Sequence, residues 1–364
     1  MRWFAALGVA IIATVLIDAF ETVVLPRRVT RRFRLTRVFY RATWIPWSRL
    51  VLLLPPRRRE SYFSFYGPLS LIVLLVVWAL GLILGFTLLH YGTGSRLSGV
   101  ATPEFGAYMY VSGETFFTLG YGDIIAISPL GRALAVLESG MGFAFLAIIV
   151  GYLPVLYQSF SRREVSISLL DARAGSPPTA AELLRRHSHD HGMESLRELL
   201  HDWERWSAEL MESHLSYPVL SYFRSQHDNQ SWLAALTAIL DTTALIIMGL
   251  EGASERQAQL TFATARHAMV DLAQVFSTAP KRLHHDRLPP DELVRLRAYL
   301  GEHGLRLREG EEAERRLHEL RAMYEPYVSS LARFLCLTLP PWMPTQQARD
   351  NWQRTAWGRI EAID

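Results

Sequence analysis

Long apolar runs dominate the first part of the chain, and a different pattern fills the rest. Residues 3–24 and 66–89 each hold about 20 mostly apolar residues, which is enough to cross a hydrocarbon core of roughly 30 Å as a helix. A third such run extends from 130 to 160. The pattern predicts three membrane-spanning helices. No small-residue cleavage motif follows the first of them, so we interpret it as a retained helix.

A short helix and a glycine-containing loop are predicted between the second and third spans. The segment EFGAYMYVSGETFF, residues 104–117, has aromatic residues at helical spacing but is too short to span a membrane. GYGDI follows it, and then Ser128 and Pro129 make a typical helix start. Irregular backbone at membrane depth is tolerated only when it is buried in protein or lines a watery path. The pattern therefore indicates a re-entrant loop.

Beyond residue 161 the pattern is that of soluble amphipathic helices, and no clear strand is predicted. In the segment SPPTAAELLRRH, Thr179 precedes Glu182 by three residues, which is typical of a helix-capping box. Further helices are expected around 194–214, 231–251, 256–276, 290–301, 308–335 and 346–361. The predicted fold class is an all-α membrane protein, with an extra transmembrane helix at 1–25, a basic segment at 26–62, a re-entrant unit at 63–160 and a helical cytosolic domain at 161–364.

One helix of the C-terminal part has an ambiguous pattern. Residues 232–250 are apolar and long enough to cross a membrane. However, Asp241, Thr242 and Thr243 lie at the centre of this run, and the rest of the chain would be outside if it crossed. We favour a buried core helix, or a tetramerisation helix, over a fourth span.

Positive charge is concentrated in the segment that follows the first span. Eleven arginines and no acidic residue lie between 27 and 59, although the net charge of the chain is +3. Because cytoplasmic loops carry the excess of arginine and lysine, this predicts a cell-membrane protein with its N-terminus outside and its C-terminal domain in the cytoplasm. We interpret the segment as an interfacial basic helix that contacts anionic lipid headgroups and is anchored by Trp44 and Trp47.

Several function classes are excluded or weakened by single residue types. Lys281 is the only lysine, so the chain has no Walker-type phosphate loop. No GxGxxG motif follows a strand-like segment, which argues against a nucleotide-binding regulatory domain. One cysteine, Cys336, excludes an intrachain disulfide. The segment RRHSHDHG carries His187, His189 and His191 around Asp190, but their spacing does not place two metal ligands one helical turn apart. We favour a solvated loop there over a zinc or proton sensor, and we expect no nucleic-acid partner.

The loop after the short helix carries the most specific signal. Glycine accepts φ > 0, so the carbonyl groups of Thr118, Leu119, Gly120, Tyr121 and Gly122 can be turned to one side to form a cation site. One chain supplies one such row, and four rows around an axis can replace the water shell of a potassium ion. With the re-entrant pattern and the trailing Asp123, the segment resembles the selectivity filter of potassium channels. The resemblance covers roughly residues 64–160.

The resemblance implies a pore domain at 63–160, made of an outer helix, a pore helix, the filter and an inner helix in a homotetramer. It implies that K⁺ is the permeant ion, with the carbonyls of Thr118, Leu119, Gly120 and Tyr121 as ligands and the Thr118 hydroxyl completing the innermost site. Leu119 stands where valine is commoner, and we expect it to tune filter packing. The implied function is passive, potassium-selective conduction and not catalysis.

Three further positions match the family. Glu114 and Asp123 match two carboxyl groups behind the filter, one of which is expected to hold a proton shared with the other or with a water, because both cannot ionise at short range. Two acids that face water separately are the alternative. Gly142 matches the glycine at which the pore-lining helix bends to open, but with Gly140 it could equally allow close helix packing.

The chain departs from familiar potassium channels in its first helix and in its tail. Asp18 and Glu21 lie one turn apart in the first helix, where an unpaired charge is costly; Arg27 and Arg28 are their expected partners, and attachment of this helix to the gate is the alternative. The tail is expected to bias the gate through a ligand that the sequence does not identify. A weakly selective cation channel, or a membrane-tethered sensor or metal-dependent enzyme acting through the tail, remain as alternatives.

A voltage-sensor interpretation of the basic segment is not favoured. Arginine recurs there at every third position, as it does in voltage-sensing helices, at 28, 31, 34 and 37. One preceding span cannot supply the counter-charges that such a sensor needs, and other arginines crowd the same stretch.

Overall fold

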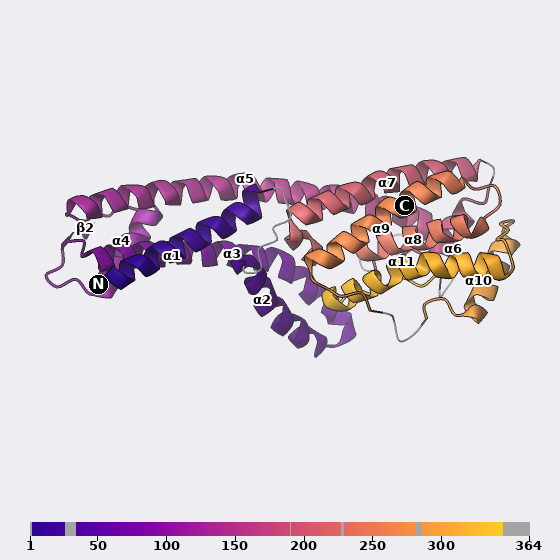
Figure 1. Cartoon of the computed structure of the whole chain (residues 1–364), viewed down its shortest axis with the longest axis horizontal. Coiled ribbons are helices and arrows are strands. Elements are labelled where there is room, and N and C mark those ends of the chain that lie inside the picture. The colour runs from indigo at the N-terminus through magenta and orange to yellow at the C-terminus, as the bar shows by residue number, and fades with distance from the viewer. Residues whose placement is uncertain (1, 26–33, 190, 227–228, 282–285, 345–364) are drawn as a thin grey trace, which may run out of the picture. The chain divides into compact units, whose positions relative to one another are not determined.

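The computed structural model describes residues 2–25, 34–189, 191–226, 229–281 and 286–344. The chain divides into two compact units, Met1–Gln158 and Ser159–Asp364. Both are built from helices, which confirms the predicted all-α class, and among the described residues a single pair of two-residue strands is added (Figure 1).

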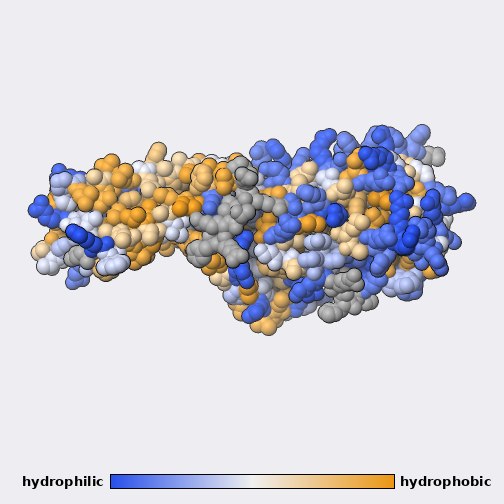
Figure 2. Space-filling model, viewed as in Figure 1, coloured by the Kyte–Doolittle hydropathy of each residue, from blue (hydrophilic) through white to orange (hydrophobic). Residues whose placement is uncertain are grey.

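The N-terminal unit contains the three predicted spans and the short helix between the last two. Its elements are α1 (Arg2–Ala19) with a π-helical turn (Phe20–Val24), α2 (Leu35–Leu52), α3 (Pro56–Thr93), β1 (Leu97–Ser98), α4 (Phe105–Phe116), β2 (Ile125–Ala126) and the first part of α5 (Pro129–Ala174). α1 with its turn, α3 and α5 are each long and apolar enough to cross a membrane. Figure 2 shows hydrophobic residues over most of the visible surface of this unit.

Helix α1 packs antiparallel to α3 through small residues. A Cβ atom added at Gly8 would lie 2.5 Å from the carbonyl oxygen of Gly85, and one added at Gly92 would overlap the backbone of Ala5. Near the same end, the ring of Phe4 packs edge-on against Tyr91. Small residues at such positions let two backbones approach closely, which is how helices associate in a membrane. The extra first helix is therefore an integral part of the N-terminal unit.

Asp18 has hydrogen-bond partners that the sequence analysis did not predict. It is fully buried, and its carboxylate accepts hydrogen bonds from the Thr36 backbone N–H (3.1 Å), the Thr36 hydroxyl (2.5 Å) and the Trp78 indole N–H (3.1 Å). Thr36 lies in the first turn of α2, where unsatisfied N–H groups and the helix dipole favour an anion. Glu21 lies 3.6 Å from Arg34, and the predicted partners Arg27 and Arg28 lie outside the described residues. Asp18 thus links α1, α2 and α3.

We expect Asp18→Ala to lower the stability of the full-length protein by about 1–3 kcal/mol, because it removes hydrogen bonds to a charged group and leaves buried donors unsatisfied. Thermal unfolding in detergent would measure the change. Thr14→Ala is a matched control on the same helix, since the Thr14 hydroxyl is exposed and bonds only within its own helix. If Asp18→Ala unfolded at the temperature of the Thr14 variant, the linking role would be wrong.

The aromatic residues of α2 pack against α3. Trp44 is 3% exposed, and its ring lies 4.7 Å from that of Tyr66 and 5.8 Å from that of Phe63. The prediction that Trp44 anchors an interfacial helix in lipid is therefore wrong, because its indole is enclosed by protein. Trp47, also predicted as an anchor, is partly buried, with its ring 6.0 Å from Tyr66.

The C-terminal unit is a helical domain built around one buried helix. Its elements are the end of α5, α6 (Ala180–Arg186), α7 (Gly192–Ser216), a 3₁₀ turn (Pro218–Tyr222), α8 (Trp232–Gly249), α9 (Glu255–Val275), α10 (Pro290–Glu302) and α11 (Glu311–Leu335). Five of the predicted helices match α7 to α11 within a few residues, and the one predicted at 346–361 lies outside the described residues. Hydrophilic residues cover much of the visible surface of this unit (Figure 2).

Helix α8 is the apolar run that is long enough to span a membrane. Every residue from Trp232 to Met248 is buried, and α6, α7, α9 and α11 pack around it. Asp241 pairs with Arg287 at 2.6 Å and accepts a hydrogen bond from the Tyr324 hydroxyl at 2.6 Å. The predicted buried core helix is confirmed, because the polar residues at its centre are satisfied by protein groups.

Candidate functional site

The segment predicted to form the filter, residues 118–122, begins just after α4 ends and is called the filter segment below. Phe117 is the C-cap, the Leu119 N–H donates to the Glu114 carbonyl at 2.8 Å, and the Thr118 N–H donates to the Thr115 carbonyl at 3.1 Å. These two bonds form a Schellman motif, in which the residue after the cap is left-handed. Thr118 occupies that position with φ 56°. A threonine in this conformation is unusual, and here the helix end imposes it.

Left-handed residues then recur at every second position of the segment. Gly120 has φ 62° and Gly122 has φ 77°, whereas Leu119 and Tyr121 are not left-handed. Such an alternation allows successive carbonyl groups to turn toward one side of the chain. The Leu119 and Tyr121 side chains are 55% and 71% exposed, and no atom lies within 4 Å of a Cβ built on either glycine. Residues 118–122 are all exposed in the single chain.

The chain after the filter is fixed by a short strand pair. Leu97 pairs with Ala126 and Ser98 pairs with Ile125. A Cβ added at Gly99 would overlap the Asp123 carbonyl oxygen, so glycine is required for this approach. These contacts hold residues 97–99, in the loop before α4, against residues 123–126, which follow the filter segment.

Asp123 and Glu114, the predicted carboxyl pair, have different surroundings. The Tyr110 hydroxyl donates to both carboxylate oxygens of Asp123, at 3.1 and 3.2 Å. Glu114 is 6% exposed, and its Oε2 has no hydrogen-bond partner among the described residues. No direct hydrogen bond joins Glu114 to Asp123 in the part of the chain that the structure describes. Tyr110 is the group that holds Asp123.

Gly142 lies where α5 crosses the end of the pore helix α4. A Cβ added there would overlap the carbonyl oxygen of Phe116, whereas Gly140 has no atom within 4 Å of such a position. The ring of Phe116 also packs against Phe145 of α5. Helix α5 is continuous through this point. The contact supports the packing role of Gly142, and the hinge stays a prediction.

A buried polar cluster beside α4 was missed in the sequence analysis. Glu138 of α5, His90 of α3 and Ser112 of α4 are each at most 1% exposed and lie in contact with one another. Glu138 is the sole acidic residue between 124 and 163. A carboxyl group within a membrane span is by default a candidate for function, so this signal was present in the sequence.

Arg163 is anchored inside the C-terminal unit. Its guanidinium donates to the carbonyls of Leu220 and Phe223, each at 2.9 Å, and to Glu164 at 2.9 Å. It also lies 3.1 Å from Nε2 of His214. Because arginine can only donate, His214 must accept with an unprotonated Nε2, so the imidazole is neutral. Burial, together with the charge of Arg163, holds the pKa of His214 well below its ordinary value.

This neutral histidine predicts a loss of stability in acid. The unfolded chain takes up a proton at His214 near pH 6.5, whereas the folded chain does not. The contribution is therefore complete above about pH 6.5 and falls by up to about 1.4 kcal/mol per pH unit below it. Hydrogen exchange of residues 192–223 in the full-length protein, corrected for the intrinsic rate, would show faster opening at low pH. His214→Gln should remove this dependence, whereas His201→Gln, at an exposed position of the same helix, should keep it.

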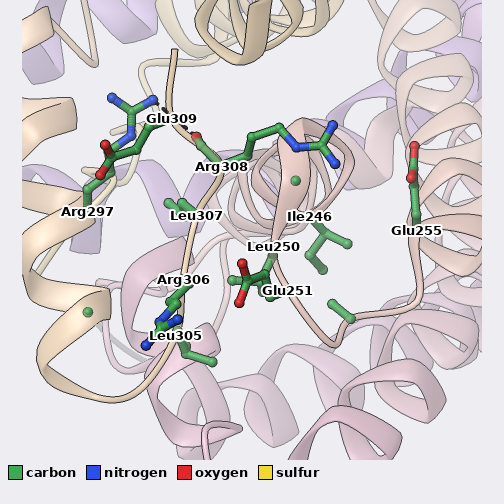
Figure 3. A pocket seen from close by; sticks show the side chains of 13 residues that line it. Ile246, Leu250, Glu251, Glu255, Arg297, Leu305, Arg306, Leu307, Arg308 and Glu309 are labelled. Carbon is green, nitrogen blue, oxygen red and sulfur yellow. Dashed lines mark hydrogen bonds between the residues drawn. The ribbon is translucent and has the colours of Figure 1, made fainter.

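The C-terminal unit also has an open cleft of about 660 Å³ (Figure 3). Three arginines (Arg297, Arg306 and Arg308) and three glutamates (Glu251, Glu255 and Glu309) line it. Arg297 and Glu255 are paired with Glu314 and Arg316. Because arginines and glutamates line the cleft in equal number, its charge does not indicate which class of ligand it would bind.

The histidine-rich segment does not form a metal site in the described residues. His187 is buried, with Nδ1 2.7 Å from the Leu183 carbonyl, so it is not part of a solvated loop. No group of three histidine, cysteine, aspartate or glutamate side chains suited to a metal occurs in the described chain. Asp190 lies outside it.

Comparison with known proteins points to the region around the filter. Residues 72–158 match a family model described as "Ion channel". The "Uncharacterized membrane protein YdjJ" of Bacillus subtilis (strain 168) is 26% identical over 187 residues, which cover 50% of this chain and 53% of that protein. The chain thus spans about half the length of the curated relative that it matches. No solved structure matches the chain.

Proposed function

We propose that four copies of this chain form a potassium-selective channel whose ion path is lined by Thr118–Gly122, because residues 72–158 match a family model described as "Ion channel". The left-handed backbone at Thr118, Gly120 and Gly122 is the observation that carries the proposal. Carbonyl oxygens turned to one side replace the hydration shell of K⁺, and ions in neighbouring sites repel one another, so that binding does not trap them. The protein conducts passively and catalyses no reaction.

The exposed surface of a single chain supports the homotetramer. One row of carbonyls cannot surround an ion, and the filter side chains are exposed. Helix α5, which follows the filter segment, also exposes large apolar residues: Val136, Leu137, Phe143, Leu146, Ile148 and Val150. Apolar patches of this kind are covered by neighbouring subunits or by lipid. Four chains around one axis would bury the filter segments against each other.

The charge distribution supports an orientation of the chain in the membrane. The contacts of Arg163 support control of the gate by the C-terminal domain. The arginine-rich segment at 27–59 supports an orientation with the N-terminus outside and the C-terminal domain in the cytoplasm, and with the basic residues near anionic headgroups. The inner helix α5 continues to Ala174, and Arg163 near its end is enclosed by the C-terminal unit. A ligand or condition that changes this domain would bias the gate in α5.

Flux measurements on the full-length protein test the proposal. Proteoliposomes loaded with K⁺ should release it through a barium-sensitive path, and reversal potentials in mixed gradients should exclude Na⁺. Equal Na⁺ and K⁺ permeability would establish a weakly selective channel instead. A monomeric or dimeric particle without a central path would overturn the proposal.

A further inference from the structure

The buried cluster of Glu138, His90 and Ser112 joins three helices beside the pore helix. Ser112 Oγ lies within hydrogen-bond distance of Glu138 Oε1 and 2.9 Å from the Ile83 carbonyl oxygen of α3. His90 Nδ1 lies 3.1 Å from the Ser95 hydroxyl, and the Tyr108 hydroxyl of α4 donates to the Ser95 carbonyl at 3.0 Å. The pore helix is thus attached to both the outer and the inner helix, a few residues before the filter.

Ser112 has one hydroxyl hydrogen for two contacts, so the second contact needs a proton on Glu138. A serine hydroxyl carries one hydrogen, and a carbonyl oxygen can only accept. If Ser112 donates to the Ile83 carbonyl, then Glu138 must be protonated and must donate to Ser112. If Glu138 is ionised, Ser112 turns its hydrogen to the carboxylate and the contact with the Ile83 carbonyl is lost. Both attachments of Ser112 exist together only while Glu138 holds a proton.

The second oxygen of Glu138 faces the histidine. Glu138 Oε2 and His90 Nε2 are 3.7 Å apart, both are buried, and neither has a hydrogen-bond partner among the described residues. The imidazole is thus the base that can receive the proton of Glu138, and it would then form an ion pair with the carboxylate. Only the arrangement with the proton on Glu138 keeps both attachments of Ser112.

Other titratable groups do not contact this pair. Those on the helices and the loop packed around it include Arg2, Tyr91, Arg96, Glu104, Tyr108, Tyr110, Glu114 and Arg132. In the described chain none of these forms a hydrogen bond or ion pair with Glu138 or His90. A buried carboxylate that lost the shared proton would therefore keep a neutral histidine as its neighbour, which is costly.

We propose that Glu138 is a positioning residue for the filter, and that the proton it shares with His90 fixes the pore helix and makes conduction depend on pH. Glu138 acts through Ser112 on α4, and α4 ends directly in the filter residue Thr118. Loss of the proton at higher pH releases one attachment of α4. This inference rests on the proposed channel function.

Flux in proteoliposomes tests the proposal when the pH on the filter side is varied. Wild-type K⁺ flux should fall roughly fivefold or more as the pH rises from about 6 to about 9, because loss of the shared proton releases one attachment of α4. Glu138→Gln keeps a donor for Ser112 and does not titrate, so it should conduct at the high wild-type level throughout. Glu104→Gln, at an exposed position before α4, should retain the wild-type pH profile. Equal pH profiles of the wild type and Glu138→Gln would overturn the proposal.

Hydrogen exchange of residues 105–116 in the same samples separates this inference from the channel function. In the wild type, the corrected protection of α4 should decrease as the pH rises, and in Glu138→Gln it should stay constant. Wild-type protein that shows this decrease but conducts no ions would refute the channel and support the attachment of α4. Protection that does not change with pH in the wild type would refute the role of Glu138 whether or not ions flow.

Discussion

Gly120→Ala is expected to abolish potassium-selective flux while leaving the amount of folded protein in the membrane unchanged. Gly120 has φ 62°, a conformation that costs an alanine about 1–2 kcal/mol. Each of the four chains would carry this cost at the same ring of carbonyls. The backbone would relax, and the oxygens would turn away from the ion path. No atom of the chain lies within 4 Å of the added methyl group, so the fold itself should tolerate it. Barium-sensitive flux and reversal potentials measure the effect.

Gly113→Ala provides the matched control for this experiment. Gly113 lies in α4, close to the filter, and likewise has no atom within 4 Å of an added Cβ. Its backbone is helical, so alanine is favoured there over glycine by about 1 kcal/mol. This variant should conduct as the wild type does. Undiminished K⁺ selectivity in Gly120→Ala would remove the main support for a carbonyl-lined path.

The parts of the fold that the sequence predicted correctly depend on local pattern. The three spans follow from uninterrupted apolar runs, and the short pore helix follows from a run too short to cross. The identity of α8 as a core helix followed from Asp241, because a carboxyl group at the centre of a span is costly in lipid. Its partners Arg287 and Tyr324 come from distant parts of the chain. The pattern could indicate that partners exist but not which residues they are.

Partners that depend on tertiary contact could not be predicted in this way. Asp18 was expected to pair with the nearest arginines, but its carboxylate binds the start of α2 and Trp78, 60 residues away along the chain. Asp123 was expected to share a proton with Glu114 or with a water, which stays a prediction, and the structure adds Tyr110 as a hydrogen-bond partner of Asp123. In both cases the fold supplies neutral donors that neither sequence proximity nor family resemblance suggested. A neutral donor carries no charge pattern by which a sequence would reveal it.

The backbone of the filter segment was also predictable from the sequence only in part. Glycine at 120 and 122 predicts left-handed residues there, and the structure has them. The left-handed Thr118 could not be predicted from composition, because a β-branched residue disfavours that conformation. It arises from the way α4 ends, with bonds from Thr118 and Leu119 back to the last turn. The backbone geometry of the predicted filter thus begins at the end of α4, so any residue that positions α4 also positions residues 118–122.

Gly142→Ala is the variant for which a packing role and a hinge role give opposite results. The methyl group would overlap the Phe116 carbonyl oxygen, which belongs to the backbone at the end of α4 and cannot change rotamer. Overpacking of this kind costs about 1–3 kcal/mol, and more where the backbone must move. We expect a large loss of assembled, folded protein and a lower unfolding temperature. Size-exclusion chromatography and thermal unfolding in detergent measure both effects.

A pure hinge predicts a different outcome for the same position. Alanine would then leave stability unchanged and alter opening alone, and Gly142→Pro, which favours a bent helix, would give a stable, open channel. In the packing role Gly142→Pro is at least as damaging as alanine, because its ring is larger than a methyl group. Gly140→Ala, two residues away with no atom in reach, controls for the effect of alanine on α5 itself. Since Phe116 lies two residues before Thr118, a stable Gly142→Ala channel would mean that the end of α4 can move without disturbing the filter.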